Sequence, residues 1–155
     1  MSEDDSVFML AALKEAQRGF KQGEVPVGCV IVLKGKIIAK AHNKVEKLKN
    51  ACKHAEVICI EKAAKKIGDF RLKDCILYTT LEPCLMCAGA ILLSRIKKII
   101  YAAEDFRHGA LVSVYKVFEK KHPIHQPSFE KSAYSEESSR LLKDFFKIRR
   151  EENER

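Results

Sequence analysis

The chain has 155 residues, a length that suits one domain built around one hydrophobic core. Hydrophobic residues make up 46% of it and charged residues 32%, which is an ordinary soluble globular composition. The formal net charge of +8 favours a polyanionic partner such as nucleic acid. We therefore expect a single domain over residues 1–155.

No segment has the sequence properties of a membrane span or of a secretion signal. The longest apolar run, residues 25–33, contains Pro26 and Gly28 and is far too short to cross a bilayer. The N-terminus is acidic and lacks the charged-then-apolar order of a signal peptide. These features predict a cytoplasmic protein with no membrane partner. In that compartment the six cysteines are expected as metal ligands or reduced core residues, and not as disulfides.

The first predicted element is an amphipathic helix. Ser6 is a favourable helix N-cap, and apolar residues follow it at helical spacing as far as Gly19 or Gly23. We expect this helix to cover one face of a sheet.

A hairpin and a basic segment come next. Residues 27–33 and 36–41 are β-rich, and Lys34-Gly35 between them is typical of a hairpin turn. Residues 44–53 carry four lysines and run directly into His54. This segment is read either as a solvated loop or as a contact surface for phosphates.

The rest of the sequence alternates helical and strand patterns without an internal repeat. The expected elements are a helix at 54–67 closed by Gly68, a buried strand at 75–80, a helix at 84–94, a strand at 98–102, a short helix or turn at 114–121, an edge strand at 129–133 and an amphipathic helix at 136–150.

Three good zinc ligands stand in two short motifs, His-Ala-Glu at 54–56 and Pro-Cys-Leu-Met-Cys at 83–87. Cys84 and Cys87 are three residues apart, so on a helix both sulfurs lie on one face. One imidazole and two thiolates suit zinc, and three protein ligands leave a fourth position open, which is the catalytic arrangement. Both motifs are expected at helix N-termini, where the helix dipole favours a thiolate.

Glu56 is the candidate general base. It stands two residues from His54, so the two side chains converge only if His54 lies at the very start of its helix. The order His-x-Glu followed by Pro-Cys-x-x-Cys is the signature of zinc nucleobase deaminases. The main alternative is a structural zinc site completed by a fourth ligand, for which Cys52 is the nearest candidate.

Beyond these motifs, the chain resembles the bacterial tRNA-specific adenosine deaminases (TadA-type) of the cytidine deaminase superfamily over almost its whole length. The segments that carry the resemblance are Gly-Glu-Val-Pro-Val-Gly at 23–28, His-Asn at 42–43, His-Ala-Glu at 54–56, residues 80–90, Ser-Arg-Ile at 94–96 and Asp-Phe-Phe-Lys-Ile-Arg-Arg at 144–150.

The resemblance implies a three-layer α/β/α fold with a five-stranded mixed sheet, a homodimer and one zinc ion per subunit. It implies hydrolytic deamination of the wobble adenosine to inosine, with a tRNA anticodon stem-loop as partner. His54, Cys84 and Cys87 would bind the zinc, and Glu56 would shuttle the proton. By the same resemblance, the substrate contacts would come from Asn43, the backbone of Ala55, and Asp105.

Two other functions remain open at this stage. The first is deamination of a free guanine, cytosine or nucleoside, since the superfamily shares the metal motif. The second is a non-catalytic nucleic-acid-binding module stabilised by zinc, against which Glu56 argues because a structural site has no use for an unliganded carboxylate. The net charge and the basic last helix favour an RNA substrate.

Overall fold

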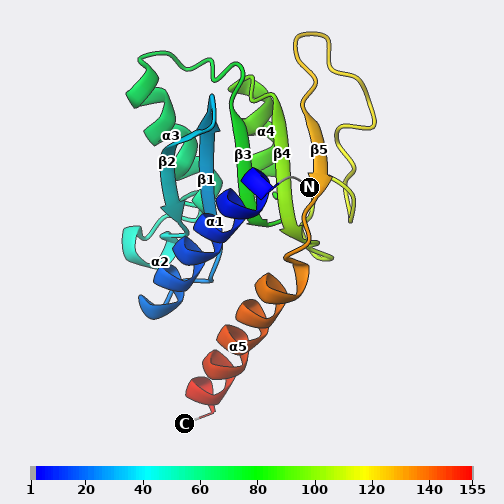
Figure 1. Cartoon of the computed structure of the whole chain (residues 1–155). Coiled ribbons are helices and arrows are strands. Elements are labelled where there is room, and N and C mark those ends of the chain that lie inside the picture. The colour runs from blue at the N-terminus through cyan, green and yellow to red at the C-terminus, as the bar shows by residue number, and fades with distance from the viewer. Residues whose placement is uncertain (1–2, 155) are drawn as a thin grey trace.

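The computed structural model describes residues 3–154. Its elements in chain order are α1 (Glu3–Lys21), β1 (Gly28–Leu33), β2 (Lys36–His42), α2 (Val45–Leu48), α3 (Ala55–Ile67), β3 (Ile76–Leu81), α4 (Leu85–Leu93), β4 (Lys98–Ala103), β5 (Ser128–Lys131) and α5 (Ser135–Asn153). The five strands form one sheet in the order β2-β1-β3-β4-β5 (Figure 1). Strands β1 and β2 are antiparallel, as are β1 and β3, whereas β3, β4 and β5 run parallel.

Helices cover both faces of this sheet, which confirms the three-layer α/β/α fold and the five-stranded mixed sheet. Helix α1 packs on β1, β2 and β3, and α5 packs on β3 and β4 beside it. On the other face, α3 packs on β1 and β2 and contacts α4. The core is therefore divided into a smaller cluster under α1 and a larger one under α3 and α4.

Helix α1 approaches the sheet closely at Gly28. A Cβ atom built on Gly28 would lie 1.9 Å from the backbone oxygen of Ala12, so any side chain there would push the helix off the strand. Met9 and Ala12 are fully buried on this face of the helix. The predicted cap at Ser6 is wrong: α1 begins at Glu3, so Ser6 lies inside the helix and not at its start.

The strand directions bring four chain segments to one end of the sheet. In the antiparallel hairpin, Gly28 at the start of β1 pairs with His42 at the end of β2. In the parallel pair, Leu81 at the end of β3 lies beside Ala103 at the end of β4. The connections to α3 and α4 also leave from this end, so it collects the residues that the sequence singled out.

One connection differs from expectation. Residues 44–53, expected as a loop, contain the short helix α2, whose backbone N–H groups at Glu46 and Lys47 donate to the buried carboxylate of Glu24 at 2.9 and 2.8 Å. Residues 114–121, for which a short helix or a turn was expected, contain turns and bends and no helix. The edge strand and the final helix are confirmed as β5 and α5. Within residues 3–154, no helix has both the length and the apolar character needed to span a membrane.

Candidate active site

His54 and Cys84 each stand immediately before a helix. His54 is the N-cap residue of α3, and Cys84 is the N-cap residue of α4; both have extended backbone conformations. Cys87 lies in the first turn of α4 and is fully buried. Within a helix, residues two apart point to different faces. His54 precedes its helix, so this rule does not keep its side chain away from that of Glu56. The predicted convergence of His54 with Glu56 thus has the backbone geometry that it requires.

The three candidate ligands lie at the spacing that zinc demands. The Nδ1 atom of His54 is 3.5 Å from the Sγ atom of Cys84 and 3.5 Å from that of Cys87. Zn–N and Zn–S bonds of about 2.0 and 2.3 Å at a tetrahedral angle place nitrogen and sulfur about 3.5 Å apart. Among residues 3–154 these three side chains form the only cluster of at least three potential metal ligands. Cys52 is exposed and does not belong to it, so the geometry favours three protein ligands over four.

Cys84 already has the character of a thiolate. The hydrogen bond from Cys87 lowers the pKa of Cys84 to about 4, and the hydrogen bond with His54 acts in the same direction, while burial opposes them. The same contact with Cys84, together with burial, raises the pKa of Cys87. Near neutral pH the pair therefore holds one proton between two sulfurs. A metal cation binding there would displace this proton, as thiolate ligation requires.

Glu56 is a buried carboxyl group beside the cluster. Its side chain is 4% exposed, and burial raises its pKa to about 7. It interacts with the Cys87 side chain but does not belong to the ligand cluster. A carboxyl group with a pKa near neutrality can both accept and return a proton, which suits general acid–base catalysis.

Asn43 has an unsatisfied polar atom in this region. Its Nδ2 donates to the Val25 backbone oxygen at 3.4 Å, but its Oδ1 is the one buried side-chain nitrogen or oxygen without a partner within residues 3–154. The adjacent Lys44 donates its backbone N–H to the Lys53 oxygen at 3.0 Å, which holds Asn43 close to the start of α3. A buried acceptor left open at such a place is suited to a donor group from a ligand.

The other two predicted contact residues are placed differently. Ala55 is the first residue of α3 and is fully buried. Asp105 is partly exposed, and its Oδ1 accepts the backbone N–H groups of Arg107 at 3.0 Å and His108 at 3.1 Å. This Asx-type turn holds Phe106 at its tip, and this residue is 78% exposed.

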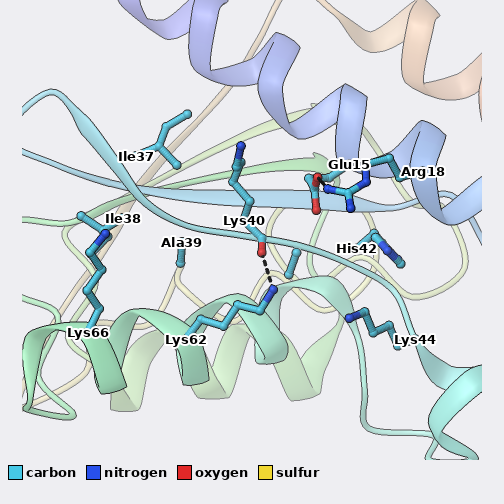
Figure 2. A pocket seen from close by; sticks show the side chains of 11 residues that line it. Glu15, Arg18, Ile37, Ile38, Ala39, Lys40, His42, Lys44, Lys62 and Lys66 are labelled. Atoms are coloured by element: carbon cyan, nitrogen blue, oxygen red, sulfur yellow. Dashed lines mark hydrogen bonds and ion pairs between the residues drawn. The ribbon is translucent and has the colours of Figure 1, made fainter.

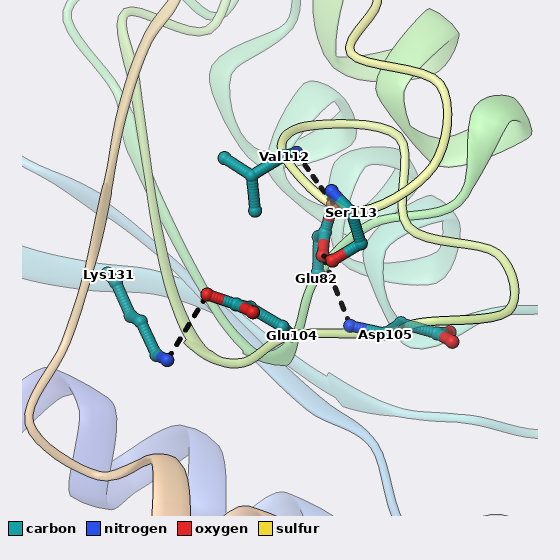
Figure 3. Close-up of polar contacts among 6 residues, drawn as sticks. All are labelled: Glu82, Glu104, Asp105, Val112, Ser113 and Lys131. Atoms are coloured by element: carbon teal, nitrogen blue, oxygen red, sulfur yellow. Dashed lines mark hydrogen bonds and ion pairs between the residues drawn. The ribbon is translucent and has the colours of Figure 1, made fainter.

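Sequence reasoning missed the carboxylate that organises this loop. Glu82 is 2% exposed and accepts hydrogen bonds from four backbone N–H groups and one hydroxyl. Figure 3 shows it with three of its partners, Asp105, Val112 and Ser113. The donors are the N–H groups of Asp105, Leu111, Val112 and Ser113 at 3.1, 2.9, 2.8 and 3.1 Å, and the hydroxyl of Ser113. Burial acts to raise the pKa of Glu82, but these hydrogen bonds outweigh it and lower the pKa. The available signal was an acidic residue directly after a buried strand.

Known proteins resemble this chain over most of its length. The family model for the cytidine and deoxycytidylate deaminase zinc-binding region matches residues 2–103. A tRNA-specific adenosine deaminase from Aquifex aeolicus is 47% identical over 90% of this chain and 92% of its own length. One from Bacillus subtilis is 39% identical over 92% of this chain and 89% of its own.

Solved structures of deaminases also resemble this chain. A structure from studies of A-to-I editing by tRNA:A34 deaminases has a TM-score of 0.85 and 38% identity, and it covers 88% of this chain and 99% of its own. The guanine deaminase from Bacillus subtilis has a TM-score of 0.63 and 35% identity, with 92% and 93% coverage. With a zinc-type ligand cluster and a buried carboxyl group on the matching fold, the chain belongs to the tRNA-specific adenosine deaminases of the zinc-binding cytidine and deoxycytidylate deaminase family.

Proposed function

We propose that this protein hydrolyses adenosine to inosine at the wobble position of a tRNA anticodon. The observation that carries the chemistry is the cluster of His54, Cys84 and Cys87 with buried Glu56 beside it. The substrate follows from the relatives, since those at 38–47% identity over most of the chain are tRNA-specific adenosine deaminases.

In this proposal His54, Cys84 and Cys87 hold one zinc ion. Zinc at such a site supplies a Lewis acid that makes water a nucleophile at neutral pH. Glu56 accepts a proton as the water oxygen adds to C6 of adenine, and it delivers that proton to the ring nitrogen N1. A second proton transfer to the exocyclic nitrogen lets the C6–N bond break, so that adenosine and water give inosine and ammonia. The low exposure of Glu56 keeps bulk water from competing for these protons.

The same proposal assigns the substrate contacts. The open Oδ1 of Asn43 accepts a hydrogen bond from the target nucleoside. The backbone of Ala55 faces the base at the start of α3, and Asp105 lies beside the ribose on the loop that Glu82 anchors. An anticodon loop presents an unstacked base at low energetic cost, which suits a site of this kind.

The protein is further proposed to act as one domain in the cytoplasm and as a homodimer. Helix α4 supports the dimer, because it is apolar on every side and yet leaves Leu85 46% and Leu93 67% exposed in one protomer. A helix of this composition is normally covered on all sides. The outer face of α4 is therefore proposed as the surface that a second copy covers.

Inosine formation in a transcribed tRNA with adenosine at the wobble position tests the proposed reaction. The guanine deaminase structure at 35% identity makes free guanine the necessary comparison substrate, with cytosine beside it. We expect turnover of the tRNA and none of the free bases. Turnover of guanine without inosine formation would identify a free-base deaminase, and RNA binding without any turnover would identify a non-catalytic module.

A further inference from the structure

A groove of about 430 Å³ runs along the free edge of β2, between α1 and α3 (Figure 2). None of the candidate zinc ligands lines it. The side chains and backbone that do are contributed by Glu15 and Arg18 of α1, residues 37–42 of β2, Lys44, and Lys62 and Lys66 of α3.

The groove carries a strong excess of positive charge. Its charged side chains are Arg18, Lys40, Lys44, Lys62 and Lys66 against a single carboxylate, Glu15. That carboxylate forms an ion pair with the Arg18 guanidinium, with a nitrogen–oxygen distance of 2.8 Å. Within residues 3–154, no ion pair joins any of the four lysines to an acidic side chain. Four positive charges thus remain for an external anion.

The lysines come from different parts of the chain and line one groove. Lys62 reaches across from α3 and donates to the backbone oxygen of Lys40 at 2.8 Å, an acceptor on the edge strand of the sheet (Figure 2). Burial lowers the pKa of Lys44, and the positive charges of Lys62 and Lys47 lower it further, against a smaller opposing effect of Glu15. This electrostatic strain is relieved by a bound anion.

One end of the groove lies beside Asn43 of the candidate active site. His42 and Lys44 line the groove and are the two neighbours of Asn43, whose open acceptor is proposed to contact the target nucleoside. From there the groove follows β2 away from the site towards Lys66, near the far end of α3. An RNA strand whose target base contacts Asn43 therefore passes close to this end of the groove.

We propose that this groove binds the sugar-phosphate backbone of the RNA on one side of the deaminated nucleotide. The inference rests on the proposed function and extends it to a second contact surface. Regularly spaced phosphates match several lysines along one edge, and lysines on flexible stems hold phosphates as point charges without reading sequence.

A different role for the same lysines is protection of the sheet edge. Charged side chains, lysine above all, discourage a free edge strand from pairing with another chain. That role predicts aggregation on their removal and no change in RNA affinity. The two roles therefore separate in a binding measurement.

The test compares two double variants that remove the same charge from the same region. The first variant, Lys62→Gln with Lys66→Gln, removes both positive charges that α3 contributes to the groove. The second, Lys65→Gln with Lys73→Gln, removes two exposed lysines that do not line the groove. Binding of the transcribed tRNA is measured against salt concentration for both and for the wild type. We expect the groove pair to reduce the slope of log affinity against log salt by about 0.7 for each phosphate that is no longer neutralised, or about 1.4 for two. The control pair should leave the slope unchanged.

Equal slopes for the two double variants would overturn the groove proposal. Differential acetylation of the wild-type lysines with and without the transcript gives a second readout that needs no variant. Protection of Lys40, Lys62 and Lys66 with Lys65 still reactive supports the proposal, and equal reactivity of all four contradicts it. Inosine formation by the wild type is measured in parallel. Groove-dependent binding without inosine would contradict the proposed reaction and still support the groove.

Discussion

The carboxylate of Glu82 accepts a hydrogen bond of 3.1 Å from the backbone N–H of Asp105. Glu82 directly follows β3, and Asp105 is two residues beyond β4, so this bond ties together the ends of two parallel strands. Through its other acceptor positions Glu82 also holds residues 111–113, of which Figure 3 shows Val112 and Ser113. One side chain thus fixes both ends of the loop that is proposed to face the ribose.

Replacing Glu82 by Gln should loosen this loop. An amide keeps one acceptor oxygen but turns an NH2 group towards backbone N–H donors, which leaves at least one of them unsatisfied. We expect a loss of about 1–3 kcal/mol in the free energy of unfolding. The KM for tRNA should rise more than kcat falls, because the candidate catalytic group Glu56 is untouched. Urea unfolding and steady-state kinetics measure the two effects.

Glu119→Gln is the control for that variant, because Glu119 is an exposed carboxylate in the same connection between β4 and β5. It should leave stability within about 0.5 kcal/mol of the wild type. A Glu82→Gln protein as stable as this control would mean that the buried carboxylate does not organise the loop.

Gly28 should not tolerate even a methyl group. Because a Cβ atom there would lie 1.9 Å from the Ala12 oxygen, Gly28→Ala must move α1 away from β1. We expect destabilisation of about 3 kcal/mol or more, at the upper end of overpacking effects. Val7→Ala on the exposed side of α1 should cost little. Thermal unfolding of both proteins checks this, and a Gly28→Ala protein as stable as Val7→Ala would show that the helix can shift without loss.

The sequence was sufficient for the parts of the site that depend on residue type and local spacing. Two helix starts, at His54 and Cys84, followed from apolar periodicity and from the zinc-ligand pattern, and the structure confirms both. The strands were equally accessible, because β-rich runs and turn residues are local signals.

The buried carboxylates were not accessible in this way. Glu24 and Glu82 are satisfied by backbone N–H groups more than twenty residues away along the chain. Backbone donors are the same at every position except proline, so no residue pattern marks them as partners. For the same reason α2 was missed: its first turn depends on Glu24 and not on a capping residue of its own.

Substitution of a proposed zinc ligand should lower the zinc content of the protein, whereas substitution of Cys52 should not change it. Cys84→Ser is expected to fall well below one zinc per chain and to lose stability, because bound zinc contributes to folding. Cys52→Ser should keep about one zinc per chain, as a three-ligand site requires. Metal analysis and the spectrum of the cobalt-substituted protein report this. A spectrum with three sulfur ligands, reduced to two by Cys52→Ser, would contradict the open site.

The proposed dimer should depend on the outer face of α4. Leu93→Glu places a charge on a side chain that is 67% exposed in one protomer, so it should not disturb the fold of that protomer. It should convert a dimer into a monomer, because an unpaired charge at an apolar interface is costly to bury. Val7→Glu, at another exposed apolar position on α1, should leave the dimer intact. Sedimentation equilibrium measures both, and a dimer that survives Leu93→Glu would place the interface elsewhere.

Glu56→Gln separates the chemistry from binding and folding. The amide has nearly the same size but cannot accept a proton, and the cluster of His54, Cys84 and Cys87 is unchanged. Zinc content and tRNA affinity should stay near the wild-type values, while turnover falls by about two to four orders of magnitude, the contribution of general acid–base catalysis. Stability should not fall, because a buried carboxyl group is replaced by a neutral amide.

His54→Ala makes the comparison informative, since it should lose zinc and activity together. Both variants are assayed on one tRNA substrate, with the metal content of each sample measured beforehand. If Glu56→Gln retains substantial turnover at full zinc occupancy, another group moves the proton. The buried position of Glu56 would then reflect packing beside Cys87 and not catalysis, and the hydrolytic sequence proposed for this site would lack its base.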